Sequence, residues 1–207
     1  GSGRSPLDAG AAPAPWPAHL ADLDAVRAYL GGAPLTLVGY SWGALLALLY
    51  ATEHREHVAR LVLVSPAPAA ARERAGAQER LAAMSARPSV QALRARLDLG
   101  DRRNRFALAV AGYFADPERA LGLTPFVVKQ SAEDAVWRSL GDYDLRPRLG
   151  ALGIPALVVH GEEDPIPIAS ARATAEALGA DFVTLARCGH VPYVEAPAEL
   201  FAPLRRF

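Results

Sequence analysis

Short apolar runs alternate with longer amphipathic segments along most of this chain. A strand buried on both faces reads as a continuous apolar run of about four to eight residues, whereas a helix repeats its apolar positions about every three to four residues. Residues 17–30 have the helical spacing, and Gly31 and Gly32 follow them as a stop signal. The apolar runs that predict strands lie at residues 35–38, 60–65, 154–160 and 181–185.

The segments between these runs have the helical pattern. Residues 42–54 follow the first predicted strand directly, and two later helices are predicted at residues 168–178 and 197–207. A longer segment, residues 69–141, separates the second strand from the third and predicts about three to five helices. Its breaks fall at Pro88, Gly100, Pro117 and Pro125. Because buried strands alternate with helices, the predicted fold class is α/β: a parallel sheet covered by helices, with a helical insertion.

The composition restricts the classes of function. Among 207 residues, 22 are Lys or Arg and 22 are Asp or Glu, so the formal net charge is 0 and no basic run indicates a nucleic-acid surface. No apolar stretch reaches the roughly 20 residues of a membrane helix, and none at the N-terminus resembles a secretion signal. We therefore expect no nucleic-acid partner, no membrane association and a cytoplasmic location. The one cysteine, Cys188, can form no internal disulfide, and we expect neither a metal nor a cofactor.

One pentapeptide carries the candidate chemistry. Gly39-Tyr40-Ser41-Trp42-Gly43 has the form G-x-S-x-G and lies directly between a predicted strand and a predicted helix, which is the context of a nucleophile elbow. In such a turn the serine hydroxyl points out of a strained bend, and the helix directs its first amides at an oxyanion. We expect Ser41 to be the nucleophile and the Trp42 amide to form the oxyanion hole. Gly39 and Gly43 are expected to remove side chains that would collide across the bend.

A serine nucleophile needs a general base, and the base needs a carboxylate to orient it. Two of the five histidines, His160 and His190, lie at the ends of predicted strands, where ligands meet parallel sheets. In the order typical of this elbow, the acid lies between the serine and the histidine. Asp164 lies between Ser41 and His190, whereas no strand-end acid lies between Ser41 and His160. The predicted catalytic residues are therefore Ser41, Asp164 and His190.

Neighbouring residues leave alternatives open. Glu162 and Glu163 rival Asp164 as the acid, and we interpret them as part of a solvated turn. Cys188 lies two residues before His190. Because Cys188 has no elbow around it, we interpret it as a small, partly buried residue and not as a nucleophile.

These residues resemble the α/β-hydrolase superfamily, and the resemblance covers nearly the whole chain. It rests on residues 39–43 as the elbow, residues 160–165 as the acid turn and residues 189–197 as the histidine loop. The resemblance implies a partial α/β-hydrolase fold in three parts. Residues 1–66 would hold the N-terminal part of the hydrolase core, residues 67–145 a helical cap, and residues 146–207 the C-terminal part of the core.

The sequence also departs from the family pattern. The family sheet has more strands than the four predicted here, and the first of them would lie upstream of residue 1. Residues 1–5 resemble the end of a D-x-R-G-x-G-x-S loop and, with Ser41-Trp42-Gly43, are typical of the proline-iminopeptidase-like (family S33-like) branch. Without the missing strands, the strand at residues 35–38 has an open apolar edge, and a second oxyanion donor is absent.

The predicted function is serine hydrolysis of a small ester or amide through an acyl-enzyme. The resemblance implies, in its narrower form, an aminopeptidase that releases N-terminal proline from a peptide substrate. The alternative is a catalytically impaired fragment that self-associates through the open sheet edge. Nucleotide binding is disfavoured because no G-x-G-x-x-G segment follows a strand.

Two polar groups outside the motif are interpreted as solvated. His54 and His57 lie in a charged helix end. Glu133 and Asp134 lie beside Trp137 in the implied cap, where iminopeptidase-like relatives use carboxylates to hold the substrate amine. We interpret these two carboxylates as a solvated helix face.

Overall fold

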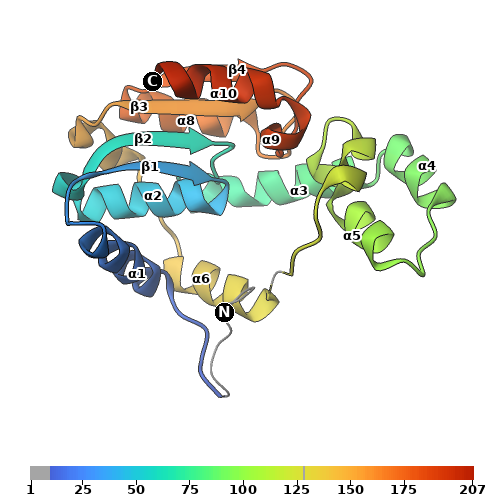
Figure 1. Ribbon diagram of the computed structural model, residues 1–207, viewed down its shortest axis with the longest axis horizontal. Coiled ribbons are helices and arrows are strands. Elements are labelled where there is room, and N and C mark those ends of the chain that lie inside the picture. The colour runs from blue at the N-terminus through green and yellow to red at the C-terminus, as the bar shows by residue number, and fades with distance from the viewer. Residues whose placement is uncertain (1–9, 128) are drawn as a thin grey trace.

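The computed structural model describes residues 10–127 and 129–207, so the motif at residues 1–5 lies outside the described residues. Four parallel strands form one sheet in the order β1-β2-β3-β4 (Figure 1). Their bounds are β1 (Leu35–Tyr40), β2 (Val58–Val64), β3 (Ala156–Gly161) and β4 (Asp181–Leu185). The predicted α/β class with a parallel sheet is confirmed.

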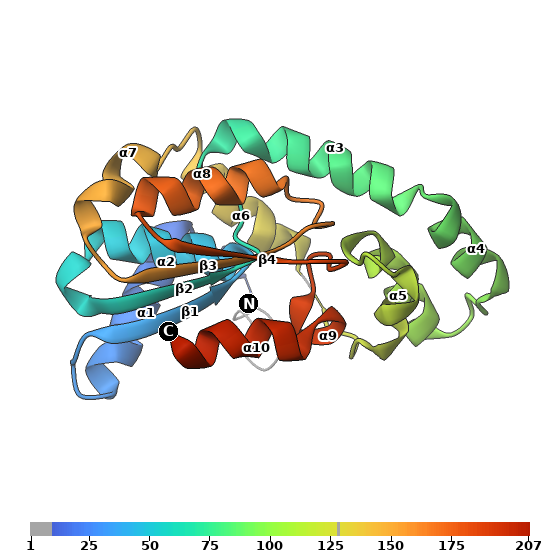
Figure 2. The same ribbon diagram turned by 90° about the horizontal axis from the view of Figure 1, so that it is seen from above.

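Helices flank the sheet and fill the segment between β2 and β3. Those outside this segment are α1 (Trp16–Tyr29), α2 (Trp42–Glu53), α8 (Ile168–Leu178), α9 (Pro192–Glu195) and α10 (Pro197–Arg206). Those inside it are α3 (Arg74–Ser85), α4 (Pro88–Arg96), α5 (Arg102–Val110), α6 (Gln130–Leu140) and α7 (Arg146–Leu149). Figures 1 and 2 show α4 and α5 beyond the ends to which the strand arrows point, so this part of the segment lies near the carboxyl edge of the sheet.

The side chains of β2 alternate between two apolar clusters, one on each face of the sheet. Leu61 and Leu63 pack in a cluster with residues of α2 and α8. Val62 and Val64 pack in a second cluster with Leu200 of α10. Figure 2 shows α8 and α10 on opposite sides of the sheet. Burial on both faces explains why the strand reads as a continuous apolar run.

The first strand is not buried as its apolar run predicts, whereas its open outer edge agrees with the expectation from the departure from the family pattern. In the described residues β1 pairs with β2 on one side only, and Val38 is 63% exposed. Val38 lies in register with Val62, so its side chain faces the α10 side of the sheet. The buried strand residues of the α10 cluster lie in β2, β3 and β4, and Tyr40 is the β1 residue that packs against it, so Val38 stays open to solvent.

In the described residues, no helix is both long enough and apolar enough to cross a membrane.

Candidate active site

The G-x-S-x-G segment forms a sharp turn between β1 and α2. Ser41 has φ 53° and ψ −119°, a region that residues with side chains rarely adopt. Its amide donates to the Val64 carbonyl at 3.0 Å, and its carbonyl accepts from the Ala44 amide at 3.0 Å. The strained residue is therefore held between the edge of β2 and the first turn of α2, as an elbow requires.

The two glycines of the motif differ in their surroundings. A Cβ at Gly39 would lie 2.4 Å from the Gly43 carbonyl oxygen and 2.5 Å from Cα of Ala44. A Cβ at Gly43 would meet no described atom within 4 Å. The steric prediction holds for Gly39 and is wrong for Gly43, because a side chain in this first turn of α2 would point into open space.

The structure brings Ser41, His190 and Asp164 together. His190 Nε2 lies 2.9 Å from Ser41 Oγ, and His190 Nδ1 lies 3.0 Å and 2.9 Å from the two carboxylate oxygens of Asp164. With Nδ1–H donating to the carboxylate, Nε2 carries the lone pair that accepts from the serine hydroxyl. The three side chains thus form a continuous hydrogen-bonded line from acid to hydroxyl.

The carboxylate of Asp164 is buried and held at a fixed angle. It is 1% exposed, and its Oδ1 also accepts from the Ile166 amide at 2.8 Å. Burial acts to raise the pKa of Asp164. The charge and hydrogen bond of His190, with smaller contributions that include the Ile166 amide, outweigh it, and the pKa lies below its usual value. The carboxylate therefore stays charged and able to orient His190.

A second buried histidine supports the acid turn. His160 Nε2 donates to the Ile166 carbonyl at 2.9 Å, and His160 Nδ1 lies 3.9 Å from Asp164 Oδ2 without a hydrogen-bond partner. Burial lowers the pKa of His160, although Asp164 acts against it. A neutral His160 thus fixes the turn after β3. From the sequence, His160 is a candidate base only, and its position at the end of β3 is the feature that could have pointed to this structural role.

Tyrosine rings flank the imidazole of His190. The ring of Tyr40, inside the elbow, lies 5.2 Å from the His190 ring, and Tyr113 lies 5.4 Å away on a segment between β2 and β3. Tyr193 packs edge-on against Tyr40 at 5.4 Å. Burial raises the pKa of both Tyr40 and Tyr113, so these rings are neutral walls of the site. Nothing in the local sequence indicates that Tyr113 contacts His190.

The predicted oxyanion donor begins α2. Trp42 is the first residue of that helix, and the first amides of a helix have no acceptor within it. The Trp42 ring packs on Trp137 of α6 at 5.4 Å, and Arg74 lies 3.9 Å over the Trp137 ring. Trp137 Nε1 donates to Glu133 at 3.4 Å. Glu133, interpreted from the sequence as solvated, is therefore exposed but linked to the residue beside the nucleophile.

The rival residues near the triad do not join it. Glu162 is exposed and Glu163 is half-buried, whereas Asp164 is buried. Cys188 is fully buried, which corrects the expected partial burial. Burial raises the pKa of its thiol to about 12, so the thiolate needed for nucleophilic attack is scarce at neutral pH.

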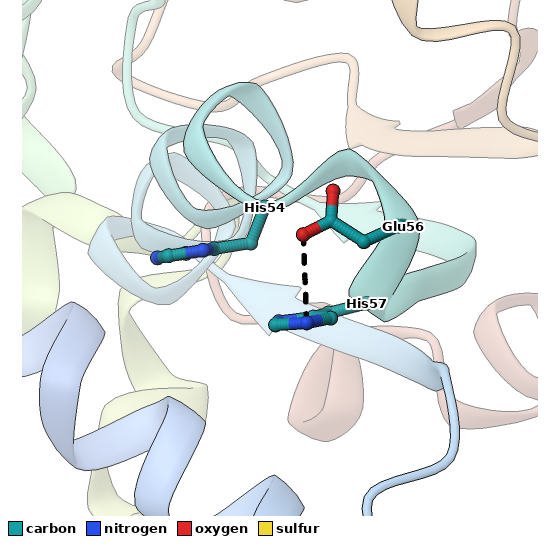
Figure 3. A group of neighbouring side chains, drawn as sticks. All are labelled: His54, Glu56 and His57. Atoms are coloured by element: carbon teal, nitrogen blue, oxygen red, sulfur yellow. Dashed lines mark ion pairs between the residues drawn. The ribbon is translucent and has the colours of Figure 1, made fainter.

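His54, Glu56 and His57 are the one group of possible metal ligands that the described residues bring together (Figure 3). Their donor atoms lie within 4.8 Å of one another, but the two imidazole rings are stacked at an interplanar angle of 6°. His57 Nδ1 is also 3.0 Å from Asp24. Because lone pairs lie in the ring planes, two stacked rings do not direct theirs at one ion. The two histidines are half-buried, which corrects the expectation that they are solvated.

A parallel sheet that carries this elbow after β1, with an acid and a histidine after β3 and β4, is a partial α/β-hydrolase fold. The sequence matches the Alpha/beta hydrolase family over residues 1–204. The chain therefore belongs to this family.

Curated relatives include two kinds of hydrolase. A proline iminopeptidase of Lactobacillus delbrueckii subsp. bulgaricus is 25% identical over 196 residues, which cover 86% of this chain and 66% of that protein. The chain thus spans slightly under two thirds of the length of that relative. A pimeloyl-[acyl-carrier protein] methyl ester esterase of Stenotrophomonas maltophilia is 39% identical over 72 residues, 34% of this chain and 28% of that protein.

Solved structures show the same fold. A carboxylesterase of Nitrososphaera gargenis has a TM-score of 0.68 at 17% identity, covering 97% of this chain and 74% of its own. A hydrolase of Pseudomonas aeruginosa has a TM-score of 0.69 at 20% identity, covering 100% of this chain and 76% of its own. At these identities the likeness concerns the fold alone.

Proposed function

We propose that this protein is a serine hydrolase that cleaves a small ester or amide through an acyl-enzyme. Ser41 Oγ attacks the substrate carbonyl while His190 Nε2 takes its proton, and the Trp42 amide stabilises the oxyanion. His190 then donates the proton to the leaving alcohol or amine as the bond to the carbonyl carbon breaks. Water, deprotonated by His190, then attacks the acyl carbonyl; the bond to Ser41 Oγ breaks, and His190 returns the proton to that oxygen. Asp164 holds the imidazole in the required tautomer throughout.

One observation carries the proposal. His190 Nε2 lies 2.9 Å from Ser41 Oγ while Nδ1 of the same ring bonds a buried carboxylate. A serine that merely filled a turn would need neither an acceptor at its hydroxyl nor a charged group behind that acceptor. Family membership and the strained backbone of Ser41 point in the same direction.

The nucleophile is tested with a fluorophosphonate probe, which labels activated serines covalently. We expect one labelled site in the purified protein and loss of labelling in Ser41→Ala by at least about 1,000-fold, since the nucleophile is removed. Ser89, which is exposed on α4, provides the control variant Ser89→Ala, and its labelling should match that of the unsubstituted protein. Labelling that persists in Ser41→Ala would exclude this assignment.

The narrower proposal is that the substrate is a peptide with N-terminal proline. It is supported by the likeness to proline iminopeptidases, whereas the shorter match to a methyl ester esterase supports an ester substrate. Prolyl-p-nitroanilide, its N-blocked form and p-nitrophenyl butyrate separate the two. Cleavage of the free prolyl amide and loss on blocking its amine would support the peptidase. Cleavage of the ester alone would favour an esterase.

A second candidate function is favoured by the outer edge of β1. In the described residues this edge has no partner strand, and Val38 is 63% exposed on it. In this alternative to the first proposal, the 207-residue chain associates with itself through this edge and is catalytically impaired. Sedimentation velocity should then show dimers or larger species, and Thr36→Pro, which removes an edge amide from the exposed Thr36, should shift them to monomer. A monomer in the unsubstituted chain would refute this.

The division into core and cap at residues 66 and 145, and the cytoplasmic location, stay predictions.

A further inference from the structure

A half-buried carboxylate outside the triad bonds two distant segments of the chain. Glu195, the last residue of α9, accepts a hydrogen bond from the Gly189 amide through Oε2 at 2.7 Å. Its Oε1 accepts from the Ala115 amide at 2.8 Å and from the Asp116 amide at 3.3 Å. Gly189 precedes His190, while Ala115 and Asp116 lie in the helical segment between β2 and β3. One side chain therefore links that segment to the histidine loop.

The same two segments also contact each other directly. The His190 amide donates to the Tyr113 carbonyl at 2.7 Å. A Cβ at Gly189 would lie 2.4 Å from the Tyr113 carbonyl oxygen and 2.7 Å from the Ala115 nitrogen. There is thus no space between the two backbones, and a shift of residues 113–116 must move the backbone of His190 or break these bonds.

The chemistry of Glu195 fits a link between backbones. An ionised carboxylate can only accept, and its hydrogen bonds from amides are stronger than those of a neutral acceptor. Burial and the nearby charge of Glu163 raise the pKa of Glu195, while the three amides act to lower it. The Glu195 carboxylate is thus partly removed from water, and backbone N–H groups supply the hydrogen bonds that water would otherwise donate.

We propose that Glu195 is a positioning residue that holds residues 113–116 against the histidine loop and thereby keeps His190 within reach of Ser41. The inference rests on the proposed function, since it concerns the same site. Loss of this link would release the backbone bond at His190. It would also release the Tyr113 ring, which packs 5.4 Å from the imidazole. The helical segment would then control the geometry of the base.

Two substitutions test the link and one controls for charge. Glu195→Gln keeps the size of the side chain. Its NH₂ group cannot accept a hydrogen bond, so on one side of the side chain two N–H donors face each other and that hydrogen bond is lost. Glu195→Asp keeps the charge and is too short to reach both segments. Glu199, exposed on α10, is the matched control, and Glu199→Gln removes a carboxylate that lies outside this contact.

The first readout is hydrogen exchange measured by mass spectrometry. In Glu195→Gln we expect amides of residues 113–116 and 187–190 to exchange about tenfold faster or more, with the strands unchanged. The second readout is the hydrolysis of p-nitrophenyl butyrate. There kcat should fall about 10- to 100-fold, while KM stays within about twofold, because the base is displaced and not the substrate pocket. Glu199→Gln should match the unsubstituted protein in both.

If these amides exchange at the same rate in Glu195→Gln as in the unsubstituted protein, Glu195 does not hold the two segments together, whatever the effect on activity. Faster exchange over the whole chain, or a fall in kcat shared by Glu199→Gln, would overturn it as well. If Glu195→Gln does not fold, Glu195→Asp decides by the same two readouts. Should Ser41 fail to react with the probe, the proposed function falls, but the exchange comparison still decides whether Glu195 joins the two segments.

Discussion

Asp164→Asn is expected to lower kcat/KM by about 10³- to 10⁴-fold without unfolding the protein. The Asp164 Oδ1 atom accepts from the Ile166 amide at 2.8 Å, so an asparagine keeps its oxygen there and turns its NH₂ group toward His190 Nδ1. That NH₂ group donates, which forces Nδ1 to accept and leaves the proton on Nε2. His190 then cannot accept the proton of Ser41, because the wrong tautomer faces the hydroxyl.

The measurement is kcat/KM on the best substrate from the ester and prolyl amide comparison. Glu162→Gln is the matched control, since this exposed carboxylate lies in the same turn, and it should change the rate by less than about twofold. An Asp164→Asn variant that retains more than about a tenth of the activity would assign the orienting acid to another residue.

The difference in stability between the unsubstituted protein and Asp164→Asn is expected to depend on pH. The pKa of Asp164 is lower in the folded protein than its usual value of about 3.9, so its charge stabilises the fold above that pH. This stabilisation is lost as the pH falls through the lower, folded pKa. The difference in melting temperature between the unsubstituted protein and Asp164→Asn should therefore be largest above about pH 5 and shrink below about pH 4. A constant difference over this range would contradict the depressed pKa.

Buried strands with short, strong apolar runs could be predicted from the sequence. The sequence predicts β4 with its observed bounds and β3 to within two residues at each end. All six residues of β3 are buried, which explains its nearly continuous apolar run. β4 lies at the other edge of the sheet, where Asp181 and Thr184 are exposed, and its signal comes from the apolar residues between and after them. β1 shows the limit of this reasoning. Its apolar run is the same in kind, yet Val38 is 63% exposed, because exposure depends on which strand lies beside it and not on the run itself.

The candidate site was predictable where its parts follow strand ends. Ser41 directly follows β1, while Asp164 and His190 lie in the loops that follow β3 and β4, and parallel strands bring such positions to one edge of the sheet. Residues that act through tertiary contacts carry no such signal. Tyr113 and Ala115 lie in a helical segment whose docking against the histidine loop cannot be read from spacing. The single turn of α9 is too short to show helical periodicity, so Glu195 was placed only as part of a family motif.

Gly39→Ala is expected to destabilise the fold by about 3 kcal/mol, whereas Gly43→Ala should leave it unchanged or slightly more stable. The new methyl at position 39 would lie 2.4 Å from the Gly43 carbonyl oxygen and 2.5 Å from Cα of Ala44. Both are backbone atoms of α2, so no side chain can rotate away, and the helix must move off β1. A methyl at position 43 meets no described atom within 4 Å and favours the helix.

Urea denaturation followed by circular dichroism compares the two variants, with unchanged slopes showing that both unfold from the same kind of native state. The midpoint of Gly39→Ala should fall well below that of the unsubstituted protein, while that of Gly43→Ala should equal or exceed it. Since both changes add one methyl to the same pentapeptide, the difference between them isolates the close approach of β1 to α2 from any general cost of losing a glycine. Equal losses at the two positions would mean that backbone freedom, and not this contact, is what the elbow requires.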